Sequence, residues 1–385
     1  MLVATTGVLP VFLAGAVGVQ LRGELHFGEA GLGRALSVAF LVSALFSALF
    51  GRVVEAMGPI RSMRFAAGLS SLTLLAVAIG AQSLLSLSVI LIGGGIANAI
   101  SQPATNLYVT RVVPAHRQGL AFAIKQSAIP AATLLGGLAV PAVALTVGWR
   151  WAFVGGAGLA VIGGFATGEV VGSKSGGPRA SPARRDQRLP TLVTLGVGVG
   201  AGALAAASLG AFATSAFTEA GFAAGNAGLL AALGSALVVA VRLVLGHHAD
   251  RRDRAGMFPV IVVMMILGAA GFALMATMQP APMLVGAMCA YSFGWGWPGL
   301  FNLAIAQANP SAPAAASGVT QTGTYLGVAV GPFLFGLLAE GPGYRAAWLL
   351  AAIAALIGAT FVWLGSRSVL AVPVGVAGPG QNSVR

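Results

Sequence analysis

Polar side chains within long apolar stretches are the strongest candidates for chemistry in this sequence. Two groups of them recur at the spacing of a single helix face. The first is Asn98, Gln102, Thr105 and Asn106, and the second is Tyr291, Trp295, Pro298 and Asn302. Because polar groups are costly to bury in lipid, the first group predicts a cavity lining in preference to hydrogen bonds between helices. For the second group both interpretations stand, since Trp and Tyr also serve as packing residues.

Lys125 lies about seven residues, or roughly 10 Å, inside its apolar stretch. Residues at a similar depth in their own stretches are Gln102, Gln126, Trp297 and Gln321. A lysine among amides and an indole would suit a carboxylate or another small anion. The alternative is a lysine that snorkels to the lipid headgroups, and the sequence leaves both open.

The remaining charged residues bear on how transport could be driven. Arg242 lies only about four residues from the end of its stretch, which favours snorkelling. All nine acidic residues fall in loops or at the ends of apolar stretches. Proton-coupled carriers usually need a titratable group within the membrane, so facilitated diffusion, anion exchange and proton symport all remain open. The sequence therefore does not decide between a coupling proton and a counter-anion.

Composition indicates which elements must position these residues. Of 385 residues, 57% are apolar and 8% are charged. A soluble domain carries about a quarter charged residues, and a disordered chain is poor in apolar ones, so both classes are excluded. A membrane helix needs roughly 20 apolar residues, and an all-α membrane protein with twelve such helices fits the length. The twelve stretches are 2–21, 33–53, 62–82, 84–110, 118–141, 149–171, 190–214, 222–246, 256–279, 281–308, 314–338 and 343–366.

The polar segments divide this series. Residues 172–189 are rich in Gly, Ser, Pro and Arg and predict a linker, whereas 367–385 predict a disordered tail. The chain starts in an apolar stretch without a basic region, which predicts a first membrane helix and not a signal peptide. The single cysteine, Cys289, excludes an internal disulfide, and no metal site is expected.

The net charge of +12 is unevenly distributed. Most Lys and Arg residues fall in the linker, the tail and the loops on their side, and only Arg22, Arg34, Arg150 and Arg345 fall on the other. The positive-inside rule then places the linker and both termini in the cytoplasm of a multi-pass protein of the cytoplasmic membrane. The excess charge accordingly predicts basic loops and no nucleic-acid partner.

The two halves of the sequence repeat each other at an offset of 195 residues. Gln126 aligns with Gln321, Gly136 with Gly331, and Gly148-Trp149-Arg150 with Gly343-Tyr344-Arg345. A single register over most of each half indicates duplication, and parallel repeats of six helices are typical of carriers that rock around a central site. The glycine run Gly196, Gly198, Gly200 and Gly202 does not complete a dinucleotide-binding motif and predicts close helix packing.

A family resemblance follows from two loops at repeat-related positions. The first carries Gly51, Glu55, Gly58 and Arg61, and the second carries Gly246, Asp250 and Arg251. Both resemble the signature loop of the major facilitator superfamily, and Trp149 to Phe153 resembles the start of the sixth helix in many members. The resemblance implies that these loop residues gate the cytoplasmic side, with Asp250 latching a helix terminus in the outward-facing state.

The resemblance also implies the fold. This is the major facilitator fold, an all-α membrane protein with twelve transmembrane helices in two pseudo-symmetric six-helix bundles. We expect an N-terminal bundle over 1–171, a cytoplasmic linker over 172–189, a C-terminal bundle over 190–366 and a disordered cytoplasmic tail over 367–385. Spans one, four, seven and ten line the cavity in family members. We expect no cofactor, no enzymatic activity and a monomeric protein.

The predicted function is secondary active or facilitative transport of a small organic solute, with an anion favoured, by alternating access. The predicted substrate-binding residues are Asn98, Gln102, Asn106, Lys125, Gln126, Tyr291, Trp295, Trp297, Asn302 and Gln321. The alternative is a proton-coupled multidrug or metabolite exporter. The sequence departs from the drug-antiporter pattern, because the fourth stretch lacks its arginine and Gly136-Gly137 is followed by Leu138.

Overall fold

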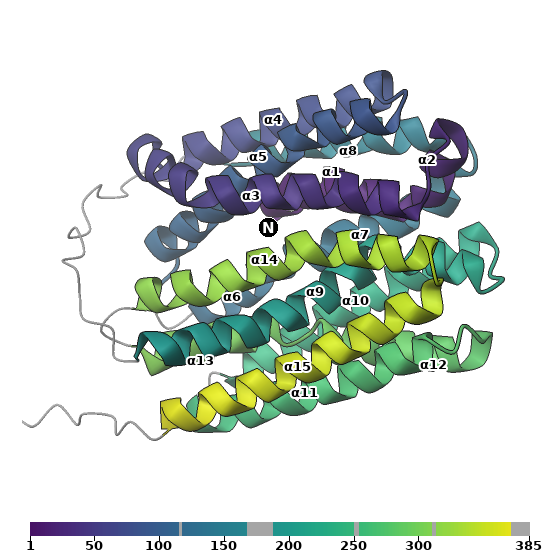
Figure 1. Ribbon diagram of the computed structural model, residues 1–385. Coiled ribbons are helices and arrows are strands. Elements are labelled where there is room, and N and C mark those ends of the chain that lie inside the picture. Colours follow the sequence, from purple (N-terminus) through teal and green to yellow (C-terminus); the bar gives the residue numbers. More distant parts are fainter. Residues whose placement is uncertain (115–117, 168–187, 250–253, 310–312, 371–385) are drawn as a thin grey trace, which may run out of the picture.

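The computed structural model describes residues 1–114, 118–167, 188–249, 254–309 and 313–370, and its regular elements are all helices there (Figure 1). Two of them, η2 and η3, are short π-helical segments. The elements are α1 (Leu2–Ala16), α2 (Gly18–Leu25), α3 (Glu29–Met57), α4 (Pro59–Gly80), α5 (Leu84–Val112), α6 (Gln118–Gln126), α7 (Ala128–Ala139), η2 (Val140–Ala144), α8 (Trp149–Phe165), α9 (Leu189–Glu219), α10 (Ala224–Ala249), α11 (Arg254–Met275), α12 (Pro280–Cys289), η3 (Ala290–Gly294), α13 (Pro298–Ala308), α14 (Pro313–Glu340) and α15 (Tyr344–Leu370).

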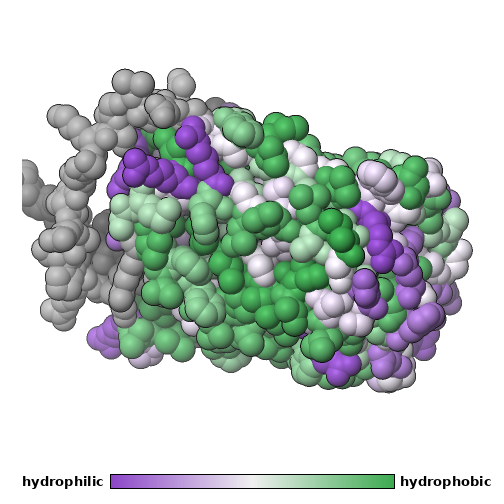
Figure 2. All heavy atoms as spheres, turned by 90° about the horizontal axis from the view of Figure 1, so that it is seen from above, coloured by the Kyte–Doolittle hydropathy of each residue, from purple (hydrophilic) through white to green (hydrophobic). Residues whose placement is uncertain are grey.

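The helices are suited to a membrane in length and composition. Among the described residues, nine helical stretches are long and apolar enough to cross a bilayer, or ten when α1 and α2 are taken as one bent span. The other two predicted stretches are α8, with 17 residues, and the interrupted series α12, η3 and α13. Figure 2 shows apolar residues gathered over the middle of the visible face and hydrophilic residues towards its ends. The all-α membrane class is confirmed, while the number of twelve crossings stays a prediction.

Several predicted stretches are interrupted rather than continuous. The stretch 2–21 is divided between α1 and α2, which meet at an angle of 64°. The fifth stretch breaks at Ser127, between α6 and α7. Pro130 follows this break and has no N–H to donate to the carbonyl of Gln126 one turn earlier, so that carbonyl is left for another partner. The tenth stretch passes through η3 and restarts at Pro298.

Glycines bring α9 and α14 together at backbone distance, as the glycine run predicted. A Cβ atom at Gly200 would lie 2.7 Å from the carbonyl oxygen of Gly323. Gly327 and Gly331, at successive turns of α14, pack in the same way against the backbone of Gly200 and Leu204. Small residues at four-residue spacing allow membrane helices to approach this closely, so the two helices form one tightly packed pair.

The repeat of the sequence recurs in the helix boundaries. The pairs α3 and α10, and α8 and α15, begin at residues separated by the same offset of 195. Gly148 and Gly343 precede the last pair, with φ angles of 102° and 99°. Side chains are strained at such angles, so glycine serves the same turn in both halves. We call the end of the bundle at Gly148 and Gly343 the far end. We call the opposite end, where α8 finishes and α9 begins, the linker end.

Candidate functional site

A cavity of about 120 Å³ lies among helices contributed by both halves of the sequence. The polar residues on its wall are Ser43, Asn98, Gln102, Gln126, Arg242, Asn302, Gln321, Thr324 and Tyr325. The aromatic residues Phe12, Phe40, Trp295, Trp297 and Phe301 form much of the rest. The wall therefore combines hydrogen-bonding groups with rings, as small-molecule sites commonly do.

Lys125 lies next to this wall and starts a chain of hydrogen bonds. Its Nζ donates to Oε1 of Gln102 (2.5 Å), and it also lies 3.4 Å from Oε1 of Gln126. Gln102 donates to Oδ1 of Asn98 (3.3 Å), and Asn98 donates to Oγ of Ser43 (3.1 Å). Ser43 in turn donates to the carbonyl of Gly95 (2.9 Å). The chain links α6, α5 and α3, and each member fixes the next.

Lys125 does not reach the headgroups as a snorkelling lysine would. It is 6% exposed and its ammonium group is held by the amides of the cavity wall. Of the two interpretations of Lys125, the structure supports the one that places it at the cavity.

Arg242 also points inward, so the prediction that it snorkels is wrong. Its side chain is 4% exposed. The guanidinium donates to the carbonyl oxygens of Gln126 and Trp295, the latter at 2.8 Å. Both carbonyls lie at helix breaks, one before Pro130 and one between η3 and α13, where the regular helical acceptor pattern fails. The broken helices thus create the acceptors that hold the arginine beside the cavity.

Two buried cations therefore share this region without an acidic partner among the described residues. The ion pairs found among all the described residues join Arg22 to Glu29 and Arg150 to Glu24. The contacts of Lys125 and Arg242 are all to neutral amide or carbonyl oxygens. Burying a charge without a counter-charge is costly, so the site carries an excess of positive charge that a bound anion would relieve.

Most predicted binding residues meet at this cavity, and two do not. Those on its wall are Asn98, Gln102, Gln126, Trp295, Trp297, Asn302 and Gln321. Asn106 is exposed and lies outside the set of residues that line the cavity, although it shares the face of Asn98 and Gln102. Tyr291 faces a different cavity because η3 interrupts the helix, so the regular spacing from Tyr291 to Asn302 does not keep one face.

Ser43, Thr324, Tyr325 and the inward orientation of Arg242 were not predicted from the sequence. Thr324 and Tyr325 follow Gln321 by three and four residues on α14, so helical spacing from Gln321 would have found them. Ser43 has no such signal, since one serine in an apolar stretch commonly bonds its own helix. Arg242 could not have been found by depth alone, because its position depends on carbonyls released by two distant helix breaks.

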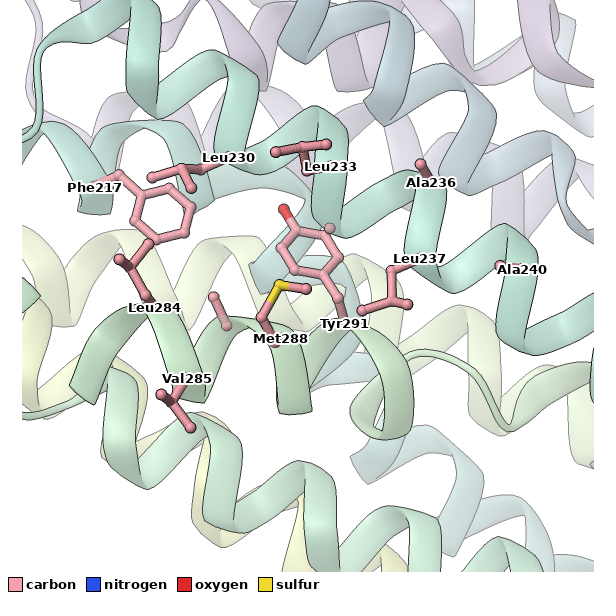
Figure 3. A pocket seen from close by; sticks show the side chains of 12 residues that line it. Phe217, Leu230, Leu233, Ala236, Leu237, Ala240, Leu284, Val285, Met288 and Tyr291 are labelled. Carbon is pink, nitrogen blue, oxygen red and sulfur yellow. The ribbon is translucent and has the colours of Figure 1, made fainter. Parts of the chain in front are cut away.

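A larger cavity of about 540 Å³ lies between α10 and α12 (Figure 3). Its lining is almost wholly apolar, and Tyr291 is its main polar residue. The ring of Tyr291 packs onto Gly234, where a Cβ atom would overlap it. Leu233 and Val285 on its rim are largely exposed, as residues facing lipid are. We place the functional site at the smaller cavity, because the converging polar groups are there.

The predicted gating residues have varied surroundings. Among the described residues, Gly51 has no neighbouring atom within 4 Å of a Cβ position, so no other helix packs closely on it there. Gly246 does pack closely, because a Cβ atom there would lie 3.0 Å from Cβ of Ala123 on α6. Glu55 and Arg61 are exposed, and Gly58 makes the turn between α3 and α4 with a φ angle of 84°. Asp250 and Arg251 lie outside the described residues, so the latch stays a prediction.

The chain belongs to the Major Facilitator Superfamily, whose family model matches residues 2–332. No curated protein matches the sequence. Among solved structures, the chain is similar to a bacterial homologue of the human lysosomal transporter Spinster in an inward-facing, occupied conformation. That similarity has a TM-score of 0.71 and 16% identity and covers 98% of this chain and 97% of the other. It is also similar to a D-xylose–proton symporter, with a TM-score of 0.68, 18% identity and coverage of 94% and 96%.

These similarities confirm the major facilitator fold that the signature loops predicted. The protein is thus a multi-pass membrane protein of a transporter family whose members bind small-molecule substrates.

Proposed function

We propose that this protein is a secondary carrier for a small organic anion, which binds in the cavity beside Lys125 and Arg242. The proposal is supported above all by the two buried cations that lack an acidic partner among the described residues. Arg242 is fixed by two carbonyls, whereas the ammonium of Lys125 has three N–H donors and two amide acceptors, which leaves one N–H for a ligand. A carboxylate that accepts from either group gains a charge-assisted hydrogen bond, about twice as strong as a neutral one.

The rest of the site supports binding in a defined orientation. Asn98, Gln102 and Gln321 come from α5 and α14, so groups from both halves could hold one ligand. Carriers of this architecture bind substrate between the repeats and expose it to each side in turn. We further propose that the linker end is cytoplasmic, as the basic residues of the loops indicate, and that 1–171 and 190–366 move as two bundles around the site.

The aromatic wall of the cavity favours a second candidate, a proton-coupled exporter of drugs or metabolites. Phe12, Phe40 and Trp295 would pack against an apolar or cationic ligand. This alternative has no use for an unpaired lysine and arginine, and a cationic drug would be repelled by both. We therefore rank it below the anion carrier.

The test is a thermal-shift binding screen on purified protein with mono- and dicarboxylates, inorganic phosphate, D-xylose and tetraphenylphosphonium. A ligand that binds only the folded state raises its melting temperature by mass action. We expect stabilisation by a carboxylate. Stabilisation by tetraphenylphosphonium alone would contradict the proposal and favour the exporter.

Lys125→Ala should then lose the stabilisation by that carboxylate, because removal of a charge-assisted contact costs about 2 kcal/mol, or more than tenfold in affinity. Lys125→Arg should restore little of it, since a planar guanidinium cannot replace a compact ammonium group. The matched control is Arg61→Ala, an exposed cation at the linker end, which should bind as the parent does. Equal affinity in Lys125→Ala and the parent would end the anion-site proposal.

A further inference from the structure

A cluster of charged and polar groups joins the two halves of the sequence at the far end. Glu29, the first residue of α3, forms an ion pair with Arg22 of α2 (2.6 Å). The hydroxyl of Tyr344, at the start of α15, donates to Oε1 of the same carboxylate. One carboxylate therefore ties α2 and α3 of the first half to α15 of the second.

A second carboxylate makes the reciprocal contact. Glu340, the last residue of α14, accepts the backbone N–H of Ala30 at 2.8 Å. This places a negative charge on the N-terminal end of α3, where unpaired N–H groups and the helix dipole favour an anion. Gly28 leaves room for this contact, because a Cβ atom there would overlap the Glu340 carboxylate. We call Arg22, Glu29, Glu340 and Tyr344 the far-end cluster.

The backbones of α3 and α14 also come into contact at this end. A Cβ atom at Gly336 would lie 2.6 Å from the carbonyl oxygen of Glu29. At the linker end of α3, by contrast, Gly51 has no neighbour within 4 Å of a Cβ position, and Glu55 is exposed. The described contacts thus hold the halves together at the far end of α3.

Glu29 differs in its burial from Glu340, the other acidic residue of the cluster, which is exposed. Glu29 is 7% exposed, and its Oε2 atom is buried without a hydrogen-bond partner among the described residues. Nε of Arg22 is also buried without a partner in the described parts of the chain. Glu219 of α9 and Glu340 of α14 face it as like charges, while Arg22 and Tyr344 are its favourable neighbours. A bare carboxylate oxygen in such a place has an open position for a proton.

We propose that Glu29 is a proton-binding site that controls the contact between the two halves at the far end. While protonated on Oε2, Glu29 carries no charge toward Glu219 and Glu340 of the second half and still accepts from Tyr344 at Oε1, so the far end stays closed. Loss of the proton restores the charge and the repulsion by Glu219 and Glu340, whereas the pair with Arg22 that it strengthens lies within the first half. Like charges that face each other across the two halves are unfavourable, so the contact loosens and the far end opens.

This assignment supplies a titratable group that the sequence analysis did not find, because Glu29 falls at the end of a stretch and only the second half buries it. It rests on alternating access but not on the anionic nature of the substrate. If Lys125→Ala does not alter ligand binding, the assignment of Glu29 is unaffected. If the assignment of Glu29 fails, the anion-site proposal is unaffected.

The test measures the separation of the halves at the far end directly. Spin labels on Gln82→Cys and Gln279→Cys, both exposed positions at the far end, report this distance by pulsed electron resonance. The background carries Cys289→Ala to remove the native thiol. We expect one short distance at about pH 5 and a growing longer distance as the pH rises to about pH 8, within the range that buried carboxylates reach.

Glu29→Gln should keep the short distance at both pH values and lose the pH response, and Tyr344→Phe should shift the distribution part of the way toward the longer distance. The matched control is Glu24→Gln, an exposed carboxylate of the same end that pairs with Arg150 within the first half. It should behave as the parent. A parent distance that does not change with pH, or a pH response that persists in Glu29→Gln, would overturn the proposal.

Discussion

Gly327→Ala should loosen the tightly packed pair of helices α9 and α14. The added Cβ would overlap the carbonyl oxygen of Gly200 on α9 and would lie 2.7 Å from its carbonyl carbon, whereas ordinary contacts begin at 3.4 Å, so the helices must separate by more than the roughly 0.7 Å that the carbon alone requires. Backbone atoms cannot rotate away as a flexible side chain would. Overpacking of this kind costs about 2 kcal/mol, and the lost contacts extend to Gly323 and Gly331.

The measurement is the melting temperature of the purified protein in detergent, followed by tryptophan fluorescence. The matched control is Gly318→Ala, on the same helix, where a Cβ atom meets nothing within 4 Å. That change should be neutral or slightly stabilising, because alanine is favoured over glycine in a helix by up to about 1 kcal/mol. Equal melting temperatures for the two variants would refute the backbone contact between α9 and α14.

Two further substitutions test other parts of the structure. Gly343→Ala should lower the melting temperature more than Gly158→Ala, by the equivalent of about 1 kcal/mol, because of these two glycines Gly343 alone has a positive φ angle. Equal effects of the two substitutions would contradict the turn geometry. Ser43→Ala should leave the amide of Asn98 without its buried acceptor, at a cost in stability of about 1–3 kcal/mol. Ser88→Ala should lower the melting temperature less, because Ser88 is partly buried and its hydroxyl bonds its own helix. The reverse order of melting temperatures would count against the chain of hydrogen bonds that starts at Lys125.

The sequence predicts the membrane class and much of the helix pattern, because both depend on local composition. The apolar stretches, the glycine packing of α9 and α14 and the offset of 195 all recur in the structure. The depth of Lys125, Gln102 and Gln126 along their helices also brings them together correctly, since antiparallel helices of similar length align by depth.

The sequence fails where the helix period fails. Tyr291 turns away from the cavity because η3 adds residues to one turn of the helix. The local sequence carries no signal that predicts this segment. Arg242 points inward because it meets carbonyls released by breaks in α6–α7 and α12–α13, two elements far from it in the chain. The burial of Glu29 likewise depends on Tyr344 of the other half. Such features come from tertiary contacts that a single-sequence pattern does not contain.

One helix carries both a wall of the cavity and a member of the far-end cluster. Gln321 and Glu340 lie on α14, separated by about 28 Å along its axis. Between them, the glycines of α14 fasten it to α9, so bending within this length would have to deform two helices at once. The pair should therefore act as a stiff lever. A small rotation that frees Glu340 from α3 would displace Gln321 relative to Lys125, and a ligand that draws Gln321 inward would exert force on the distant carboxylate.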